Sequence, residues 1–123
     1  MYLTKNFKLQ EFQCKCGCAM PASVYVNILS LADQLQILRD HLGTSINLTN
    51  AYRCESHNKA VGGAKKSQHI LGKAADIKVL DTPPEHVESL ILCLIEEGFI
   101  QEGGLHAYKT FVHYDNRGKK ARW

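Results

Sequence analysis

The sequence lacks the features of fibrous, disordered and membrane-spanning proteins. Three prolines and nine glycines among 123 residues are too few for a collagen-like or low-complexity chain. No apolar run approaches the roughly 18 residues that a transmembrane helix needs, so we expect no membrane insertion. The polar start, residues 1–6, does not resemble a signal peptide. We therefore expect either synthesis in the cytosol or a mature form cut from a precursor.

An excess of charge of one sign is also missing. Lys and Arg number 15 against 12 Asp and Glu, which gives a net charge of +3. Because Lys and Arg form no long run, we expect no binding of nucleic acid. The length and the 45% hydrophobic content predict one domain over residues 1–123 with its own core, which we expect to be a monomer.

Cysteine, by contrast, is present in an unusual arrangement. Cys14, Cys16 and Cys18 cluster, whereas Cys54 and Cys93 stand apart. The cluster has three interpretations: reduced thiols, a structural metal knot, or a disulfide to Cys54. Its spacing is tighter than that of ordinary zinc knots, which favours reduced thiols. Cys93 lies in an apolar helical segment and is expected to be a small core residue.

Hydrophobic periodicity predicts the order of helices and strands. Apolar residues recur at helical spacing between Pro21 and Gly43, and again after Pro83 until Gly98. The remaining predicted elements are a short helix or turn at 6–12, a strand at 46–49, a short helix at 55–61, a loop at 64–72, a strand at 74–80 and a hairpin at 104–114. This order predicts an α+β domain, with helices packed on a small, mainly antiparallel sheet.

The residues that carry chemistry lie in two motifs. In the first, the run from Ser67 to Asp76, His69 and Asp76 lie on either side of a glycine; the second is His113-Tyr114-Asp115. Two His and one Asp match the number of protein ligands of a catalytic zinc, which keeps one position open. Because strand side chains alternate, His113 and Asp115 share a face, and Asp115 can orient the His113 ring.

The two motifs together resemble the zinc D-Ala-D-Ala peptidases. The shared pattern is Ser-x-His-x-x-Gly-x-Ala-x-Asp followed by a late His-x-Asp, and further segments at 50–53, 57–64, 103–108 and 121–123 fit as well. The resemblance covers about residues 7–123. It implies a hedgehog/D,D-peptidase fold, a Zn²⁺ cofactor with His69, Asp76 and His113 as metal ligands, and a peptidoglycan peptide as substrate.

The resemblance also implies a reaction: hydrolysis of a peptide bond adjacent to a D-amino acid, in stem peptides or cross-links. The family includes D,D-carboxypeptidases and peptidoglycan endopeptidases, among them phage endolysins. A phage lysin made in the cytosol that acts on the cell wall, or a mature secreted enzyme, would fit this sequence. The alternative is a catalytically inactive zinc-bearing domain that binds cell wall or protein. Its support is Thr110, which stands where many family members carry Glu or Asp.

Since Thr110 cannot accept a proton, we expect the C-terminal hairpin to supply the catalytic group. If the hairpin turns tightly, His106 faces His113 on the neighbouring strand. This pairing favours His106 as the proton shuttle and Asp115 as the group that orients His113, with Glu102 next in line.

Four residues near these motifs are candidates for substrate binding. The Arg53 guanidinium suits a bidentate contact with a carboxylate or carbonyl, and in the family the matching arginine contacts substrate. An ion pair between Arg53 and Glu55 is the alternative. Ser67 and Gln68 flank the metal ligand and could bind substrate backbone or only pack around it. Tyr108 could present its hydroxyl to the cleft or pack in the core.

Overall fold

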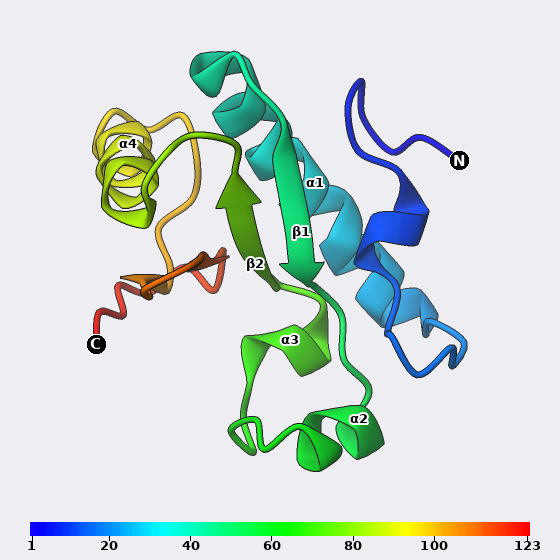
Figure 1. Cartoon of the computed structure of the whole chain (residues 1–123). Coiled ribbons are helices and arrows are strands. Elements are labelled where there is room, and N and C mark those ends of the chain that lie inside the picture. The colour runs from blue at the N-terminus through cyan, green and yellow to red at the C-terminus, as the bar shows by residue number, and fades with distance from the viewer.

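A four-stranded antiparallel sheet lies at the centre of the computed structural model, which describes residues 1–123 (Figure 1). Its strands are β1 (Ile46–Asn50), β2 (Ala74–Val79), β3 (Leu105–Ala107) and β4 (Val112–Asp115). They are arranged in the order β1-β2-β4-β3, and every neighbouring pair is antiparallel. The predicted sheet and α+β class are therefore confirmed.

Two long helices and three short ones surround the sheet. The long helices are α1 (Ala22–Leu42) and α4 (Pro84–Glu96), and the short ones are η1 (Leu9–Phe12), α2 (Glu55–Ala60) and α3 (Gln68–Leu71). Figure 1 shows α1 running along the sheet behind β1, whereas α4 lies on the side of β2 away from β1. As predicted, α1 ends at Gly43, whose left-handed backbone (φ 69°) lets its N–H bond to the Arg39 carbonyl. No helix is both long enough and apolar enough to cross a membrane.

Two local predictions are wrong. The predicted loop at 64–72 contains the helix α3, which the Ser67 hydroxyl caps by accepting the His69 N–H at 3.1 Å. A four-residue helix is too short to show periodicity, so the sequence pattern missed it. Cys93 is exposed on α4 and does not belong to the core, because the apolar face of α4 turns Val87, Ile91 and Leu94 inward instead.

The two faces of the sheet differ in character. Apolar side chains of β2, β3 and β4 point to one face and join the single core with α1 and α4: Ala75, Ile77, Leu105, Val112 and Tyr114. Because side chains alternate along a strand, Asp76, His106 and His113 point to the other face. That face carries the polar residues of the two sequence motifs.

Candidate metal centre

Strand register brings the two motifs together. On the polar face of the sheet, Asp76 of β2 lies directly opposite His113 of β4, which lies opposite His106 of β3. His69 reaches the same place from α3, just before β2, and its carbonyl accepts the N–H of Arg53 at 3.1 Å. The predicted pairing of His106 with His113 is therefore confirmed, and all three predicted metal ligands meet at one point.

Hydrogen bonds to the second ring nitrogens determine which imidazole atoms are free. The Nδ1 of His69 lies 2.7 Å from the Ala51 carbonyl, which can only accept, so this nitrogen carries the proton. The Nε2 of His113 lies 2.7 Å from Oδ2 of Asp115, and it donates in the same way. The lone pairs left over, on Nε2 of His69 and Nδ1 of His113, point at Oδ1 of Asp76, at 3.3 and 3.1 Å.

These three atoms fit a zinc ion. They lie within 4.8 Å of one another, and all three residues are buried. Zinc bonds of 2.0–2.1 Å in tetrahedral geometry place ligand atoms about 3.4 Å apart, close to the distances from Asp76. Three acceptors that face one another would repel without a cation between them. The group therefore needs a shared positive charge, which either protons on the two ring nitrogens or a metal ion can supply, and its ligand chemistry suits Zn²⁺.

Asp76 is held in the ionised form that a metal ligand needs. Burial by itself raises the pKa of this carboxyl. Without a metal, protons on the two ring nitrogens that face Asp76 donate to its carboxylate, and these bonds from His113 and His69 outweigh burial and lower the pKa well below its usual range. A neutral carboxylic acid would bind a cation poorly, so this environment favours metal binding across the physiological pH range.

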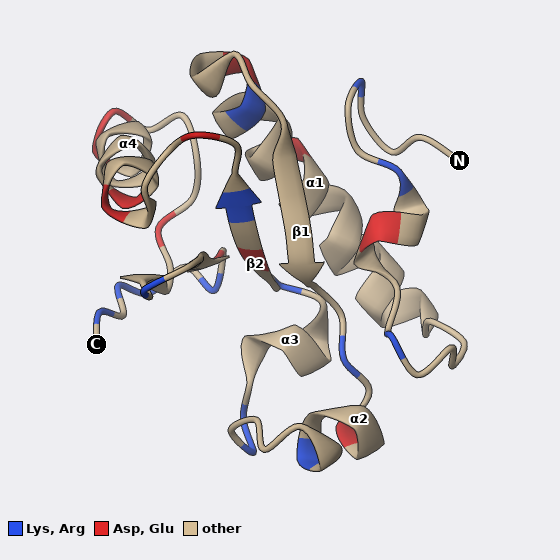
Figure 2. Cartoon of the chain, in the orientation of Figure 1, with Lys and Arg blue, Asp and Glu red and all other residues tan.

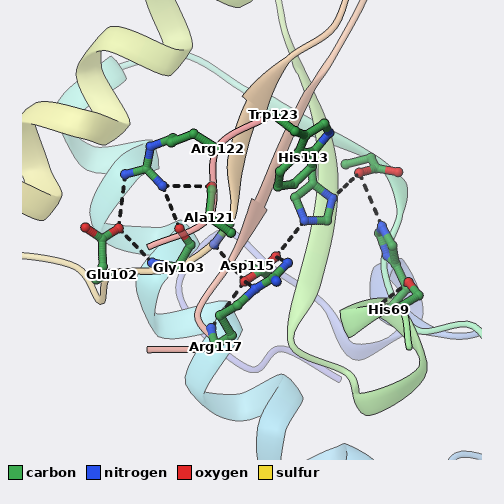
Figure 3. Close-up of polar contacts among 12 residues, drawn as sticks. His69, Glu102, Gly103, His113, Asp115, Arg117, Ala121, Arg122 and Trp123 are labelled. Atoms are coloured by element: carbon green, nitrogen blue, oxygen red, sulfur yellow. Dashed lines mark hydrogen bonds and ion pairs between the residues drawn. The ribbon is translucent and has the colours of Figure 1, made fainter. Parts of the chain in front are cut away.

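Asp115 lies on the side of the His113 ring away from His69 (Figure 3), and it does not line the cleft. Its side chain is fully buried, and it accepts bonds from His113, from the Arg117 guanidinium at 2.7 and 2.8 Å, and from the Gly104 N–H at 2.8 Å. Burial raises the pKa of Asp115, but the bonds from Arg117, His113 and Gly104 lower it well below the usual range. This geometry suits the predicted orienting role and offers no free oxygen to a substrate.

A cleft of about 530 Å³ opens above the three ligands. Four predicted substrate-binding residues line it: Arg53, Ser67, Gln68 and Tyr108. Two cations and two aromatic rings that the sequence did not single out also line it: Lys66, Arg117, Phe111 and Trp123. The predicted catalytic pair, His106 and Asp115, does not form part of its wall.

The comparison with protein families bears on this site. The family model described as peptidase M15 matches residues 5–115. The chain belongs to the peptidase M15 family. This confirms the resemblance, because M15 enzymes are zinc-dependent peptidases, and the cluster of His69, Asp76 and His113 is where the chain offers such a metal site. No curated protein matches the chain.

In this M15 peptidase, Trp123 covers the predicted proton shuttle. The indole ring stacks on His106 at 5.4 Å between ring centroids, and it meets the His113 ring in an edge-on arrangement at 5.2 Å. Its Nε1 donates to the Tyr108 hydroxyl at 2.9 Å. Because Trp123 lines the cleft and His106 does not, His106 could reach a substrate only if the indole moved. The catalytic role of His106 stays a prediction.

The position of Trp123 depends on contacts that the sequence does not reveal. Gly104 and Ala121 form a parallel bridge. Arg122 bonds to the Gly103 carbonyl at 2.7 Å and to the Glu102 carboxylate at 3.0 Å (Figure 3). Glu102, the third candidate for proton transfer, is therefore engaged outside the cleft. The one available signal was that the chain's single tryptophan ends a segment typical of the family.

Arg53 has no carboxylate partner. The five ion pairs of the structure do not include it, so the predicted alternative, a pair with Glu55, is absent. Its Nη2 reaches only the Ser67 hydroxyl, at 3.5 Å, and its buried Nε has no partner. Lys66 adds a second free cation. Figure 2 shows Lys and Arg around α2, which also carries Glu55, and several Asp and Glu segments around α4. The cleft therefore suits an anionic ligand.

Proposed function

We propose that this M15 peptidase hydrolyses a peptide bond adjacent to a D-amino acid in peptidoglycan stem peptides or cross-links. The observation that carries the proposal is the position of the three ligand atoms, at the floor of a cleft whose Arg53 and Lys66 have no acidic partner. Stem peptides carry free carboxylates, which such cations attract. The resemblance to D-Ala-D-Ala peptidases supports the same substrate class.

The chain's own residues divide the work of binding and orientation. A zinc ion held by His69, Asp76 and His113 would supply Lewis-acid chemistry, polarising the scissile carbonyl and activating a water. Arg53 binds a substrate carboxylate or carbonyl through its guanidinium, and Ser67 and Gln68 bind substrate backbone. The Tyr108 hydroxyl accepts the Trp123 N–H, so its own proton is free to bond to the substrate.

Proton transfer belongs, in this proposal, to the C-terminal hairpin. Thr110 is exposed at its tip and has no acidic group. We assign the shuttle to His106, which requires the Trp123 ring to turn away when substrate binds, and the orientation of His113 to Asp115. Substrate peptide that displaces the indole would then bring His106 to the cleft.

Digestion of purified cell walls tests the function. The zinc-loaded protein is incubated with sacculi and with defined muropeptides, and products are separated by chromatography and identified by mass. Released D-alanine would indicate a carboxypeptidase, and conversion of cross-linked dimers to monomers an endopeptidase. A chelator and the variant His69→Ala should both abolish product formation, because two protein ligands are too few to hold zinc.

A second candidate is a zinc-bearing domain that binds cell wall or protein without cleaving it. Thr110 and the covered His106 favour this alternative, since neither places a proton acceptor in the cleft. If the zinc-loaded chain sediments with sacculi but yields no product from any muropeptide, this candidate replaces the peptidase. We further propose that the protein acts as a monomer on the cell wall, either after cytoplasmic synthesis, as phage lysins do, or as a mature secreted form.

A further inference from the structure

Four cysteine thiols meet on the loop between η1 and α1, apart from the catalytic cleft. Cys14, Cys16 and Cys18 come from this loop, and Cys54 from the N-terminus of α2. The Cys14 sulfur lies 3.3 Å from that of Cys16 and 3.9 Å from that of Cys54, and the sulfurs of Cys16 and Cys54 are 3.5 Å apart. All four sulfurs lie within 4.8 Å of one another. The fold thus brings Cys54 to three cysteines that lie 36 or more positions before it in the sequence.

The separations match a tetrahedral metal site. Zinc–sulfur bonds of about 2.3 Å place the sulfurs of a tetrahedral site about 3.8 Å apart. The three separations among Cys14, Cys16 and Cys54, 3.3 to 3.9 Å, lie around this value. A disulfide joins sulfurs in pairs, at about 2.0 Å, and gives no reason for four of them to be mutual neighbours. Four sulfur donors are the ligand set of a closed, structural zinc site.

We propose that Cys14, Cys16, Cys18 and Cys54 form a second metal site, which binds one structural Zn²⁺ through four thiolates. The tight Cys-x-Cys-x-Cys spacing, which argued for free thiols, is compatible with this site. Gly17 takes a left-handed backbone (φ +82°) with open space around it, so the loop can reverse between Cys16 and Cys18. The distant Cys54 completes the set.

Main-chain N–H groups already point at the sulfurs. The Cys54 N–H lies 3.4 Å from the Cys14 sulfur, and the His57 N–H lies 3.4 Å from the Cys54 sulfur. Such N–H groups stabilise the negative charge that thiolate ligands carry, so the backbone around the four sulfurs is already arranged for a metal site.

The site would fasten the N-terminal segment to the wall of the cleft. Cys54 directly follows Arg53, and the N–H of Tyr52, one residue earlier, donates to the Phe12 carbonyl at 3.1 Å. A metal shared by Cys14 and Cys54 links the same two segments a second time. It would thereby fix the backbone that presents Arg53 to the cleft. The assignment does not depend on the proposed peptidase activity.

Metal analysis of the full chain, purified under reducing conditions, tests the site. We expect two zinc ions per chain in the parent, and one in each of the variants Cys16→Ser, Cys18→Ser and His69→Ala. Both cysteines are exposed, so their replacement leaves the core intact. Cys93→Ser is the matched control, because Cys93 is equally exposed but isolated on α4, and it should keep two ions.

Cobalt substitution provides a second readout that needs no folded variant. Co²⁺ bound to four thiolates gives strong sulfur-to-cobalt charge-transfer absorption, which His and Asp ligands do not give. The parent and His69→Ala should show these bands, and Cys18→Ser should lose or weaken them. A parent with a single zinc that His69→Ala removes, or cysteines found paired as disulfides, would overturn the assignment. Two ions without peptidoglycan hydrolysis would instead refute the proposed function alone.

Discussion

Asp115→Asn is the sharpest test of how the metal centre is built. The buried carboxylate accepts five hydrogen bonds. Three reach Oδ1, from the Gly104 N–H and from the main-chain N–H and Nε of Arg117, and two reach Oδ2, from His113 Nε2 and Arg117 Nη2. An asparagine has one acceptor oxygen and a donor NH₂ group. Because Oδ1 serves more donors, the amide oxygen should take its place, and the NH₂ should face His113.

The expected loss of stability depends on which hydrogen-bond donors lose their acceptor in Asp115→Asn. The Arg117 side chain is 31% exposed, so its free N–H can turn to water. The His113 ring is buried and cannot turn to water. It either keeps its Nε2 proton without an acceptor, at a cost of about 1–3 kcal/mol, or moves that proton to Nδ1, the nitrogen that zinc needs. Loss of the ion pair with Arg117 adds to this, so we expect the free energy of unfolding to fall by about 2–4 kcal/mol. Loss of the group that orients a metal-binding histidine should weaken zinc binding about 10- to 100-fold.

Two measurements check this prediction. Urea unfolding in the presence of a chelator gives the stability of the metal-free chain, and competition with a chromophoric chelator gives the zinc affinity. His69→Ala, measured alongside, accounts for zinc bound elsewhere. Glu102→Gln is the matched control, because it makes the same change beside an arginine at 35% exposure. Glu102→Gln should lower the free energy of unfolding by less than about 1 kcal/mol. If Asp115→Asn behaves like this control in both assays, the reasoning fails.

Three further predictions concern the cleft and its support. Arg53→Lys should keep its zinc but lower kcat/KM on muropeptides about tenfold or more, because lysine cannot form a bidentate contact; unchanged kinetics would make Arg53 structural. His106→Ala should lower kcat about 100-fold with zinc retained, and a parent rate would place proton transfer elsewhere. Gly72→Ala should lower the free energy of unfolding by about 2–4 kcal/mol. The backbone φ of Gly72 is positive, and a Cβ added there would lie only 2.8 Å from Cγ1 of Val24. Gly43→Ala, with positive φ and open space, should cost only about 1–2 kcal/mol. Equal urea midpoints for the two variants would contradict this.

Features encoded by neighbouring residues could be predicted from the sequence. Helix α1 showed its period and its glycine stop, and the alternation along β4 placed His113 and Asp115 on one face. The tight hairpin then set His106 opposite His113, as the register confirms. These predictions succeeded because each depends on contacts within a few positions or across one turn.

Features that depend on distant parts of the chain could not be predicted. Trp123 reaches the cleft because Ala121, two residues earlier, forms a parallel bridge with Gly104. A bridge between two loops leaves no periodic pattern in the sequence, so it could not be predicted. A link from the cluster to Cys54 was one interpretation of the sequence, but Cys54 lies 36 positions beyond Cys18, so spacing alone could not decide whether it joins the cluster. Arg53 was found from its family motif, but its lack of a carboxylate partner required coordinates. In each case the missing information was tertiary packing.

The two histidines of the metal centre are held in different ways, and this difference determines where the centre is vulnerable. His69 donates to the main-chain carbonyl of Ala51 at 2.7 Å. A substitution at position 51 changes only the side chain, so it keeps this acceptor unless it also moves the backbone. His113 donates to the side chain of Asp115 at 2.7 Å, which a single substitution removes. Both bonds fix a tautomer that leaves one nitrogen free for the metal. Losses of zinc affinity from changes outside the three ligands should therefore concentrate on the Asp115 side of the centre, and on the Gly104 and Arg117 groups that hold Asp115 in place.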